Sequence, residues 1–419
     1  MKTITDIGKA AKKAAYKLAV ATTEQKNQAL LNMAEQLEKN YDDIMEANTL
    51  DMANAMAKDK PKAFLDRLML TEARIKGMAK GLRDLVELPD PIGNIDDKWT
   101  AAEGIEITKI RVPLGVVGII YEARPNVTAD GAGICLKTGN AVILRGGSDA
   151  INSNLMVGRL LAKGIADAGL PAEAVQVVED TSRETAGKMM ILNRYISLLI
   201  PRGGKGLIQS VVQNATVPVI ETGAGNCHVF VDSAANLKKA VDIIINAKTQ
   251  RPAVCNAVES LLVAEERAEH SLLVIAEALR KAEVEIRGCE RTVEVLSAQG
   301  FDVTPAADED YYAEYGALIL SCKVVKDVEA AIEHINQYGT HHSDCIITEN
   351  EENAALFRAG VDSAAVYVNA STRFTDGEQF GFGAEIGIST QKLHARGPMG
   401  LNEMTSYKYL INGSGQIRK

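Results

Sequence analysis

The run Val116-Val-Gly-Ile-Ile-Tyr121 decides the fold class, because it carries no charge and is followed by further short apolar runs. Strands that are apolar on both faces are typical of a parallel sheet covered by helices on both sides. The further runs lie at 141–144, 175–178, 196–200, 217–220 and 229–231, with helical patterns at 154–168 and 181–192 between them. We therefore predict a doubly wound α/β domain, whose ligands bind at the carboxyl ends of its strands.

The segment before this domain is predicted to be helical over residues 5–88. Thr22 and Gln25 form a capping-box signature, and a second box, Thr181 with Glu184, predicts the start of the 181–192 helix. In the stretch 104–112 apolar and polar residues alternate, as in a half-exposed strand. Such a strand is either a surface hairpin or an edge that pairs with another subunit.

A second alternation of helices and strands follows and predicts a second α/β domain over about residues 228–392. We expect helices at 237–247, 269–282 and 328–337, and strands at 258–263, 317–321, 345–348 and 364–369. The closing residues 407–415 offer a short strand within a polar tail.

The composition excludes several classes of function. A net charge of −9 over 419 residues argues against a nucleic-acid partner, which needs a concentrated basic face. No apolar run approaches the length of a membrane span, and the N-terminus lacks the apolar core of a signal peptide. The six cysteines are scattered without a Cys-x-x-Cys pair, so neither disulfides nor a metal site is expected. A cytoplasmic protein with a small-molecule substrate is the simplest interpretation.

The stretch Lys248-Thr-Gln-Arg-Pro-Ala-Val-Cys-Asn256 places a cysteine just after two cationic residues and before an apolar strand. Nearby cations lower the pKa of a thiol and favour the nucleophilic thiolate. Cys255 is therefore a candidate nucleophile for an acyl or carbonyl carbon. A buried structural cysteine is the competing interpretation, and the residues alone do not separate the two.

Two glycine-rich turns follow predicted strands, Arg145-Gly-Gly-Ser148 and Arg202-Gly-Gly204. Glycine permits close backbone approach, a following helix offers its N-terminus to an anion, and each turn supplies an arginine suited to phosphate. Each could instead be only a tight connection, but two in one sheet favour a nucleotide. In Glu122-Ala-Arg-Pro-Asn126, the asparagine could donate to an oxyanion or serve as a turn residue after proline.

Together these segments resemble the aldehyde dehydrogenase superfamily, in particular its members that reduce L-glutamate 5-phosphate with NADPH in proline biosynthesis. The matching segments run in order along nearly the whole chain: 112–128, 136–148, 201–204, 225–232, 248–256 and 380–401. The resemblance implies two Rossmann-like domains and a small oligomerisation region. It implies a cofactor-binding domain over 1–98 and 111–227, a catalytic domain over 228–396, and oligomerisation strands in 99–110 and 397–419.

The resemblance also implies roles for individual residues. Cys255 matches the family's nucleophile and Asn126 its oxyanion donor. The cofactor residues would be Arg145, Gly146, Gly147, Ser148, Arg202, Gly203, Gly204 and Glu314. Among these, Arg145 would pair with the 2′-phosphate of NADPH, and Glu314 would hold the nicotinamide ribose. Glu221 falls where oxidising relatives keep a general base, which a reductive reaction does not need.

For the substrate, Arg251 is expected to screen the departing phosphate, with Lys248 as the second candidate. Glu122 would pair with the ammonium of the amino-acid end. The α-carboxylate of the substrate would be held by Asn369, Ser371 or Arg373.

The runner-up function is an acylating aldehyde dehydrogenase for another acyl phosphate or thioester, and a silent nucleotide-binding protein is the third. We expect a homo-oligomer. Association with the upstream glutamate kinase is attractive because the kinase product is labile, but nothing in the sequence supports it.

Overall fold

The computed structural model describes residues 2–418, and these form two compact units. Unit 1 comprises Met1–Thr222, Gly381–Gly387 and Met399–Lys419, and unit 2 comprises Gly223–Phe380 and Ile388–Pro398. The predicted boundary after residue 227 therefore lies five residues too late. Residues 381–387, predicted to be catalytic, belong to unit 1 instead.

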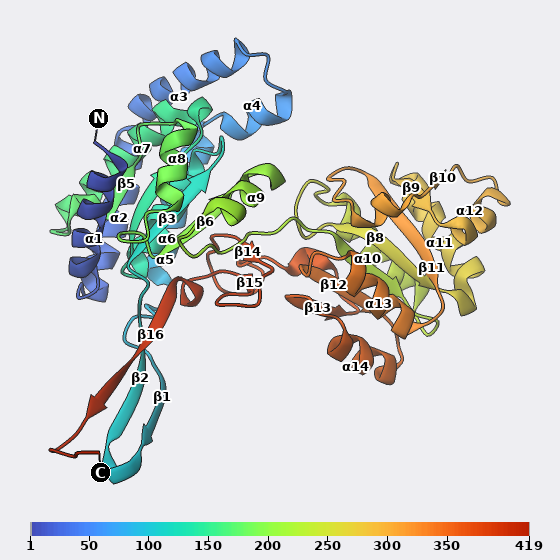
Figure 1. The fold of residues 1–419 in the computed structure, drawn as a ribbon. Coiled ribbons are helices and arrows are strands. Elements are labelled where there is room, and N and C mark those ends of the chain that lie inside the picture. Colours follow the sequence, from blue (N-terminus) through green and yellow to red (C-terminus); the bar gives the residue numbers. More distant parts are fainter. Residues whose placement is uncertain (1, 419) are drawn as a thin grey trace. The chain divides into compact units, whose positions relative to one another are not determined.

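Unit 1 contains nine α-helices and two sheets within the part of the chain that the structure describes (Figure 1). Its helices are α1 (Ile4–Leu18), α2 (Thr23–Lys39), α3 (Tyr41–Met56), α4 (Lys62–Leu68), α5 (Glu72–Glu87), α6 (Asn126–Lys137), α7 (Ile151–Asp167), α8 (Arg183–Met190) and α9 (Lys205–Asn214). Its strands are β1 (Ile95–Thr100), β2 (Glu106–Pro113), β3 (Val116–Tyr121), β4 (Ala141–Arg145), β5 (Val175–Val177), β6 (Leu198–Arg202) and β16 (Thr405–Asn412).

The central sheet of unit 1 is parallel, with the strand order β5-β4-β3-β6. Every residue of β3 is buried, as its uncharged sequence predicts. Helices α1, α6 and α7 contact the strands, while α2 and α5 pack outside α7 and α6. The predicted doubly wound arrangement is thus confirmed for this unit.

The capping box predicted at Thr22 and Gln25 is present at the start of α2, with both reciprocal hydrogen bonds. The box predicted at Thr181 and Glu184 is wrong. Helix α8 begins at Arg183, and the Ser182 hydroxyl accepts from the Thr185 N–H at 3.2 Å.

The run 217–220, predicted as a strand, forms only a single bridge between Val219 and Leu199. The Leu199 N–H donates to the Pro218 carbonyl and the Ile220 N–H to the Leu199 carbonyl. Proline has no N–H for a ladder, so the pairing stops there.

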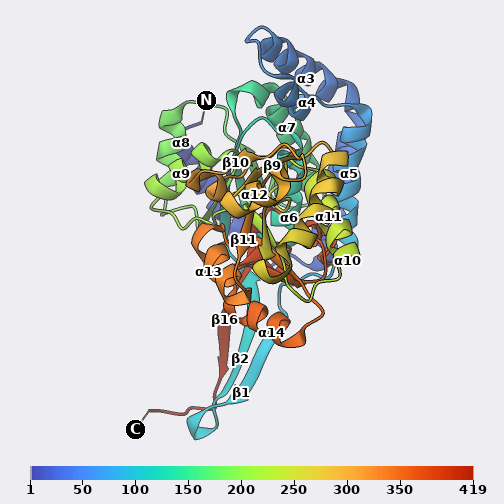
Figure 2. The ribbon, with the colours of Figure 1, turned by 90° about the vertical axis from the view of Figure 1, so that its right-hand side faces the viewer.

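The second sheet of unit 1 is antiparallel, in the order β1-β2-β16, and joins the predicted 104–112 strand to the C-terminal strand. Figures 1 and 2 show it as a long ribbon that extends from the rest of the unit. Large side chains on it remain exposed, among them Tyr407, Tyr409 and Ile411. Trp99 meets Tyr409 edge-on, with ring centroids 6.0 Å apart.

Unit 2 contains the predicted second parallel sheet, in the order β10-β9-β11-β8-β7-β12-β13. Its helices are α10 (Leu237–Thr249), α11 (Ala268–Lys281), α12 (Glu290–Ser297), α13 (Val328–Tyr338) and α14 (Glu351–Gly360). Its strands are β7 (Cys227–Val231), β8 (Val258–Ala264), β9 (Glu285–Gly288), β10 (Thr304–Pro305), β11 (Ile319–Val325), β12 (Ser343–Ile347), β13 (Ala365–Val368), β14 (Ile388–Ser389) and β15 (Gly397–Pro398).

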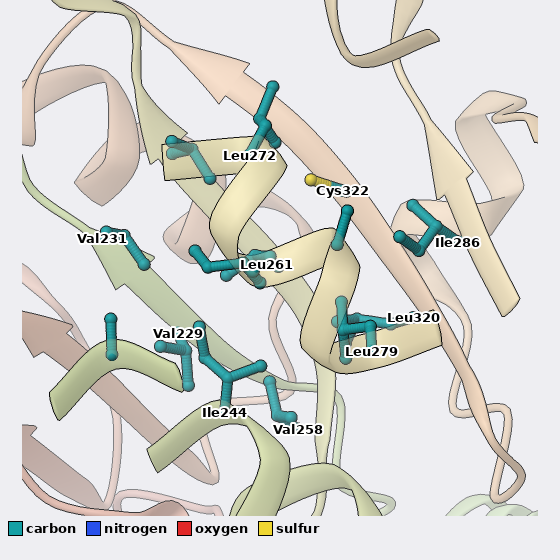
Figure 3. Close-up of a cluster of buried hydrophobic side chains, with 14 of the residues drawn as sticks. Val229, Val231, Ile244, Val258, Leu261, Leu272, Leu279, Ile286, Leu320 and Cys322 are labelled. Carbon is teal, nitrogen blue, oxygen red and sulfur yellow. The ribbon is translucent and has the colours of Figure 1, made fainter. Parts of the chain in front are cut away.

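The core of this sheet forms where α10 and α11 lie against the central strands (Figure 3). Val229 of β7, Leu261 of β8 and Ile244 of α10 are each at most 1% exposed. Strand β9 and helices α12 and α14 were not predicted. Strand β9 carries Glu285 and Arg287, which pair with each other at 2.9 Å, so its sequence lacks the apolar run of its neighbours.

Candidate functional site

A cavity of about 730 Å³ lies in unit 1, at the carboxyl ends of β3, β4 and β6. Parallel α/β sheets bind their ligands at this edge. Five of the residues predicted from the sequence or close to them in the chain line the cavity: Glu122, Arg145, Gly147, Ser148 and Asp149. The cavity wall also includes Lys60, Phe64, Thr181 and Arg183.

The first predicted turn follows β4 and forms one wall of this cavity. A Cβ on Gly146 would lie 2.1 Å from the Asn154 amide nitrogen, so only glycine fits there. The guanidinium of Arg145 is not extended into the cavity as an unattached group. Its Nη2 donates to the carbonyls of Thr181 and Ser182, the second at 3.2 Å.

The second predicted turn follows β6 and is tied to the first by Glu122. The Gly204 N–H, at the start of α9, donates to Glu122 Oε2 at 3.1 Å. A Cβ on Gly203 would lie 2.7 Å from the Glu122 carboxyl carbon. Neighbouring Arg202 leaves its strand half-buried, and its guanidinium lies close to the Gly387 backbone. Glu122 thus fixes a glycine turn in the cavity wall of unit 1, and its pairing with a substrate ammonium stays a prediction.

Asn126 is the first residue of α6 and is exposed in unit 1. Its amide nitrogen donates to Asp130 Oδ2, one helical turn later, at 3.0 Å. The contact fixes which way the amide points and leaves its second N–H for another acceptor. The sequence signal for this partner was the spacing of four residues on a helix.

Cys255 lies in unit 2, in the half-buried turn between α10 and β8. The Cys227 thiol donates to the Cys255 carbonyl at 3.2 Å. Burial raises the pKa of Cys227, so this thiol keeps the proton that it donates. The turn also rests against Gly225, where a Cβ would lie only 1.4 Å from the Cys255 carbonyl oxygen. The nucleophile turn therefore requires glycine at position 225.

Gly225 is in turn held by Glu314, whose Oε1 accepts from the Gly225 N–H at 2.9 Å. Glu314 was predicted as a cofactor residue, and the structure brings it to the support of the Cys255 turn within unit 2. The sequence analysis did not single out Gly225. The signal was its place two residues before the buried Cys227.

Lys248 was the second candidate for screening the departing phosphate, and this prediction is wrong. Its side chain and that of Glu259 are fully buried, and the Nζ–Oε2 distance is 2.5 Å. Burial raises the pKa of Glu259 and lowers that of Lys248, while their opposite charges act against both shifts. The pair is a structural ion pair that links α10 to β8.

Arg251 and Arg373 carry the remaining cationic charge near this turn. Arg373 lines a second cavity, of about 290 Å³, in unit 2, with Asn246, Gln250, Phe374, Asp376, Glu378 and Gln379. Its Nε donates to Gln250 Oε1 at 3.1 Å. Burial, together with the charge of Arg251, lowers the pKa of Arg373. The two positive charges of Arg251 and Arg373 favour the binding of an anion near both guanidinium groups.

The loop that carries Arg373 is hydrogen-bonded to Asn256, the residue after Cys255. Thr372 donates to the Asn256 carbonyl at 2.7 Å, and the Asn256 amide donates to the Thr375 carbonyl at 2.9 Å. Ser371 is buried, and its hydroxyl accepts from the Arg373 N–H at 3.3 Å. The loop geometry thus connects this cavity to the Cys255 turn.

Asn369 was a candidate for the substrate carboxylate, and its side chain is held by the backbone of Thr348. Its amide oxygen accepts from the Thr348 N–H at 3.0 Å and its amide nitrogen donates to the Thr348 carbonyl at 2.7 Å. Both ends of the side chain are thereby used to join β12 to β13, and its φ is +56°.

No helix within residues 2–418 combines the length and apolar character that crossing a membrane requires. Likewise, the described histidines, cysteines and carboxylates form no group of three that could hold a metal ion.

The parallel sheet of unit 1 with its glycine turns, and the second parallel sheet of unit 2 with its cysteine turn, are the architecture of the aldehyde dehydrogenase class of oxidoreductases. A model of the aldehyde dehydrogenase family matches residues 1–298, and the chain belongs to this family. Its members use nicotinamide cofactors.

Within the family the chain groups with the gamma-glutamyl phosphate reductases. It is 57% identical to that of Caldanaerobacter subterraneus subsp. tengcongensis and 59% identical to that of Clostridium botulinum, strain Alaska E43. Each comparison covers 98% of both chains. The crystal structure of gamma-glutamyl phosphate reductase from Thermotoga maritima superposes with a TM-score of 0.97 at 50% identity, over 100% of each chain. The predicted family and fold are confirmed.

Proposed function

We propose that this protein reduces L-glutamate 5-phosphate with NADPH, giving L-glutamate 5-semialdehyde and phosphate in proline biosynthesis. The observation that carries the proposal is the cysteine turn of unit 2, a half-buried thiol on a backbone fixed by Gly225 and Cys227. The reductase relatives, matched over 98% of the chain, supply the substrate.

The residues present in unit 1 fit a nicotinamide dinucleotide. The cavity is large enough for the adenosine half, Phe64 and Ala123 offer apolar surface, and the N-terminus of α9 begins at a glycine turn beside it. Lys60, Arg145 and Arg183 provide cations for phosphate groups. When bound, NADPH supplies the hydride that reduces the thioester to the aldehyde and frees the thiol.

Cys255 acts first, as the thiolate that attacks the acyl carbon of the substrate. A carbon–sulfur bond forms, the carbon–oxygen bond to phosphate breaks, and the phosphate takes the electron pair. The backbone N–H of Cys255 donates to the oxyanion of the intervening tetrahedral species, and the resemblance to the family assigns the second donor to the amide of Asn126. Arg251, exposed beside Arg373, screens the departing phosphate. Glu221 has no step in this sequence, because no water is activated.

The amino-acid end of the substrate binds at the second cavity of unit 2. Arg373 pairs with the α-carboxylate, because its guanidinium lines this cavity and is oriented by Gln250. Asp376 and Glu378, in the same wall, supply negative charge for the ammonium. The Ser371 hydroxyl accepts from the Arg373 N–H and so holds the loop that carries Arg373.

The exposed ribbon of β1, β2 and β16 supports assembly into a homo-oligomer. Its outward residues include Trp99, Tyr407, Tyr409 and Ile411, each at least 39% exposed. Apolar side chains of this kind on an open sheet are typical of surfaces that pair with another copy. A cytoplasmic location follows from the biosynthetic role.

The reverse reaction tests the proposal most directly. Glutamate 5-semialdehyde, inorganic phosphate and NADP⁺ are mixed with the protein, and reduced cofactor is followed by its absorbance. We expect reduction that depends on phosphate. Propionaldehyde in place of the semialdehyde distinguishes an acylating dehydrogenase of other substrates: equal rates with both aldehydes, or no dependence on phosphate, would refute the proposed substrate.

Replacing Arg373 by methionine is expected to raise KM for glutamate 5-phosphate roughly 10- to 100-fold with little change in kcat, the loss of a charge-assisted hydrogen bond. Arg358→Met, on exposed α14, is the matched control. Turnover of acetyl phosphate, which lacks the amino-acid end, should not respond to the Arg373 change. An equal loss for both substrates would show that Arg373 acts through the fold.

A further inference from the structure

The segment between α3 and α4 places two lysines on one carboxylate at the edge of the unit 1 cavity. Lys58 Nζ lies 3.0 Å from Asp149 Oδ1 and Lys60 Nζ lies 3.2 Å from Asp149 Oδ2. Asp149 is the middle residue of the short turn Ser148–Ala150 that leads into α7, directly after the predicted cofactor turn. Asp149 and Lys60 both line the cavity, and none of the three was singled out from the sequence.

The charges in this cluster do not cancel. Burial acts to raise the pKa of Asp149, but the hydrogen bonds from the two lysines outweigh it and keep the carboxylate ionised. Two ammonium groups around one carboxylate leave one positive charge in excess. The Lys60 ammonium also lies over the Phe64 ring, 4.7 Å from its centroid, which holds it at the cavity wall. An excess cation held on a cavity wall is a site for an anion of the ligand.

Arg145 is less suited to this task than its place in the turn suggested. Its Nη2 is committed to the carbonyls of Thr181 and Ser182, so the guanidinium braces the loop before α8. The side chains of Lys58 and Lys60 are 55% and 31% exposed, and each ammonium group has three N–H donors, so each can take a further acceptor.

We propose that Lys58 and Lys60, positioned by Asp149, bind the 2′-phosphate of the cofactor and so set the preference for NADPH over NADH. The inference rests on the proposed function for the identity of the cofactor. Asp149 positions the lysines and would itself repel a phosphate if they were removed. A ligand without the 2′-phosphate makes no use of the pair.

The test compares 2′,5′-ADP with 5′-AMP, which differ only in the 2′-phosphate, by titration calorimetry. In the double variant Lys58→Met/Lys60→Met we expect the Kd of 2′,5′-ADP to rise about 30-fold, the loss of one to two charge-assisted hydrogen bonds. The Kd of 5′-AMP should change by less than about twofold, since the contacts that do not involve the 2′-phosphate are untouched. Lys62→Met, exposed at the start of α4 and outside the cavity wall, is the matched control.

An unchanged Kd for 2′,5′-ADP, or equal losses for both nucleotides, would overturn the inference. So would a selective loss of 2′,5′-ADP in Arg145→Met but not in the lysine variant. The same proteins are then assayed with glutamate 5-phosphate. If the Lys58→Met/Lys60→Met variant reduces glutamate 5-phosphate normally and still prefers NADPH over NADH, the lysine subsite is refuted and the proposed function stands. Selective nucleotide binding without any reduction refutes the proposed function and leaves the lysine subsite standing.

Discussion

Replacing Cys255 by alanine is expected to lower reductase turnover by about 10⁴-fold or more while leaving NADPH affinity unchanged. The sulfur is the atom to which the acyl group is transferred, so without it no thioester forms. The substitution leaves the predicted cofactor residues of unit 1 unchanged, and it also leaves in place the Gly225 N–H through which Glu314 of unit 2 supports the Cys255 turn. Turnover is measured with glutamate 5-phosphate, and cofactor binding is measured separately by fluorescence titration.

Cys289 provides the matched control for this prediction. It is the other half-buried cysteine of the six, and its thiol lies 3.3 Å from the Thr292 hydroxyl, away from the nucleophile turn. Cys289→Ala should keep full turnover, and iodoacetamide should label Cys255 first in the unaltered protein. Substantial turnover in Cys255→Ala would eliminate the covalent mechanism, whatever the labelling shows.

The parallel sheets were predictable because most of their strands are short runs of consecutive apolar residues. Val116–Tyr121 and Val258–Ala264 are buried on both faces, so β3 is a continuous apolar run and β8 is apolar apart from Glu259 and Ser260. Strand β9 escaped because it pairs through Glu285 and Arg287 near the edge of the sheet, where charged side chains are tolerated. The failed strand at 217–220 shows the converse, since Pro218 interrupts an apolar run that otherwise fits.

The site residues were predictable by type, while their partners were not. Cys255 and the glycine turns could be found because their chemical signals lie in neighbouring residues: cations before the cysteine, and an arginine before each pair of glycines. Glu122 and Asn369 were proposed for the amino-acid end of the substrate, and Lys248 for its phosphate because it is a cation just upstream of Cys255. Their actual partners, Gly204, Thr348 and Glu259, are fixed only by the fold.

Distance along the chain explains the largest omission. Asp149 and its lysines are 89 and 91 residues apart, so no local pattern reveals that two ammonium groups meet one carboxylate. Gly225 and Cys255 are likewise separated by a helix, and only the close backbone approach shows that glycine is required. Such contacts become visible once the sheet order is known.

Replacing Asn126 by alanine is expected to lower kcat for glutamate 5-phosphate about 10²- to 10³-fold, with little change in KM. The amide would donate to charge that develops only in the transition state, so its removal affects the chemical step and not ground-state binding. Its orientation depends on Asp130, which takes one of its two N–H groups. Asp130→Ala should therefore lower kcat by a smaller factor, because the amide remains but is no longer held.

The competing interpretation of Asn126, a turn residue after Pro125, makes the opposite prediction. The first residue of α6 would then matter for folding, so Asn126→Ala would lower the melting temperature and leave kcat of the folded protein unchanged. Asn54→Ala, at an exposed position on α3, measures the effect of an ordinary asparagine change. Thermal unfolding and kcat measured on the same preparations separate the two interpretations, since an oxyanion donor at an exposed helix start contributes to the rate and hardly to stability.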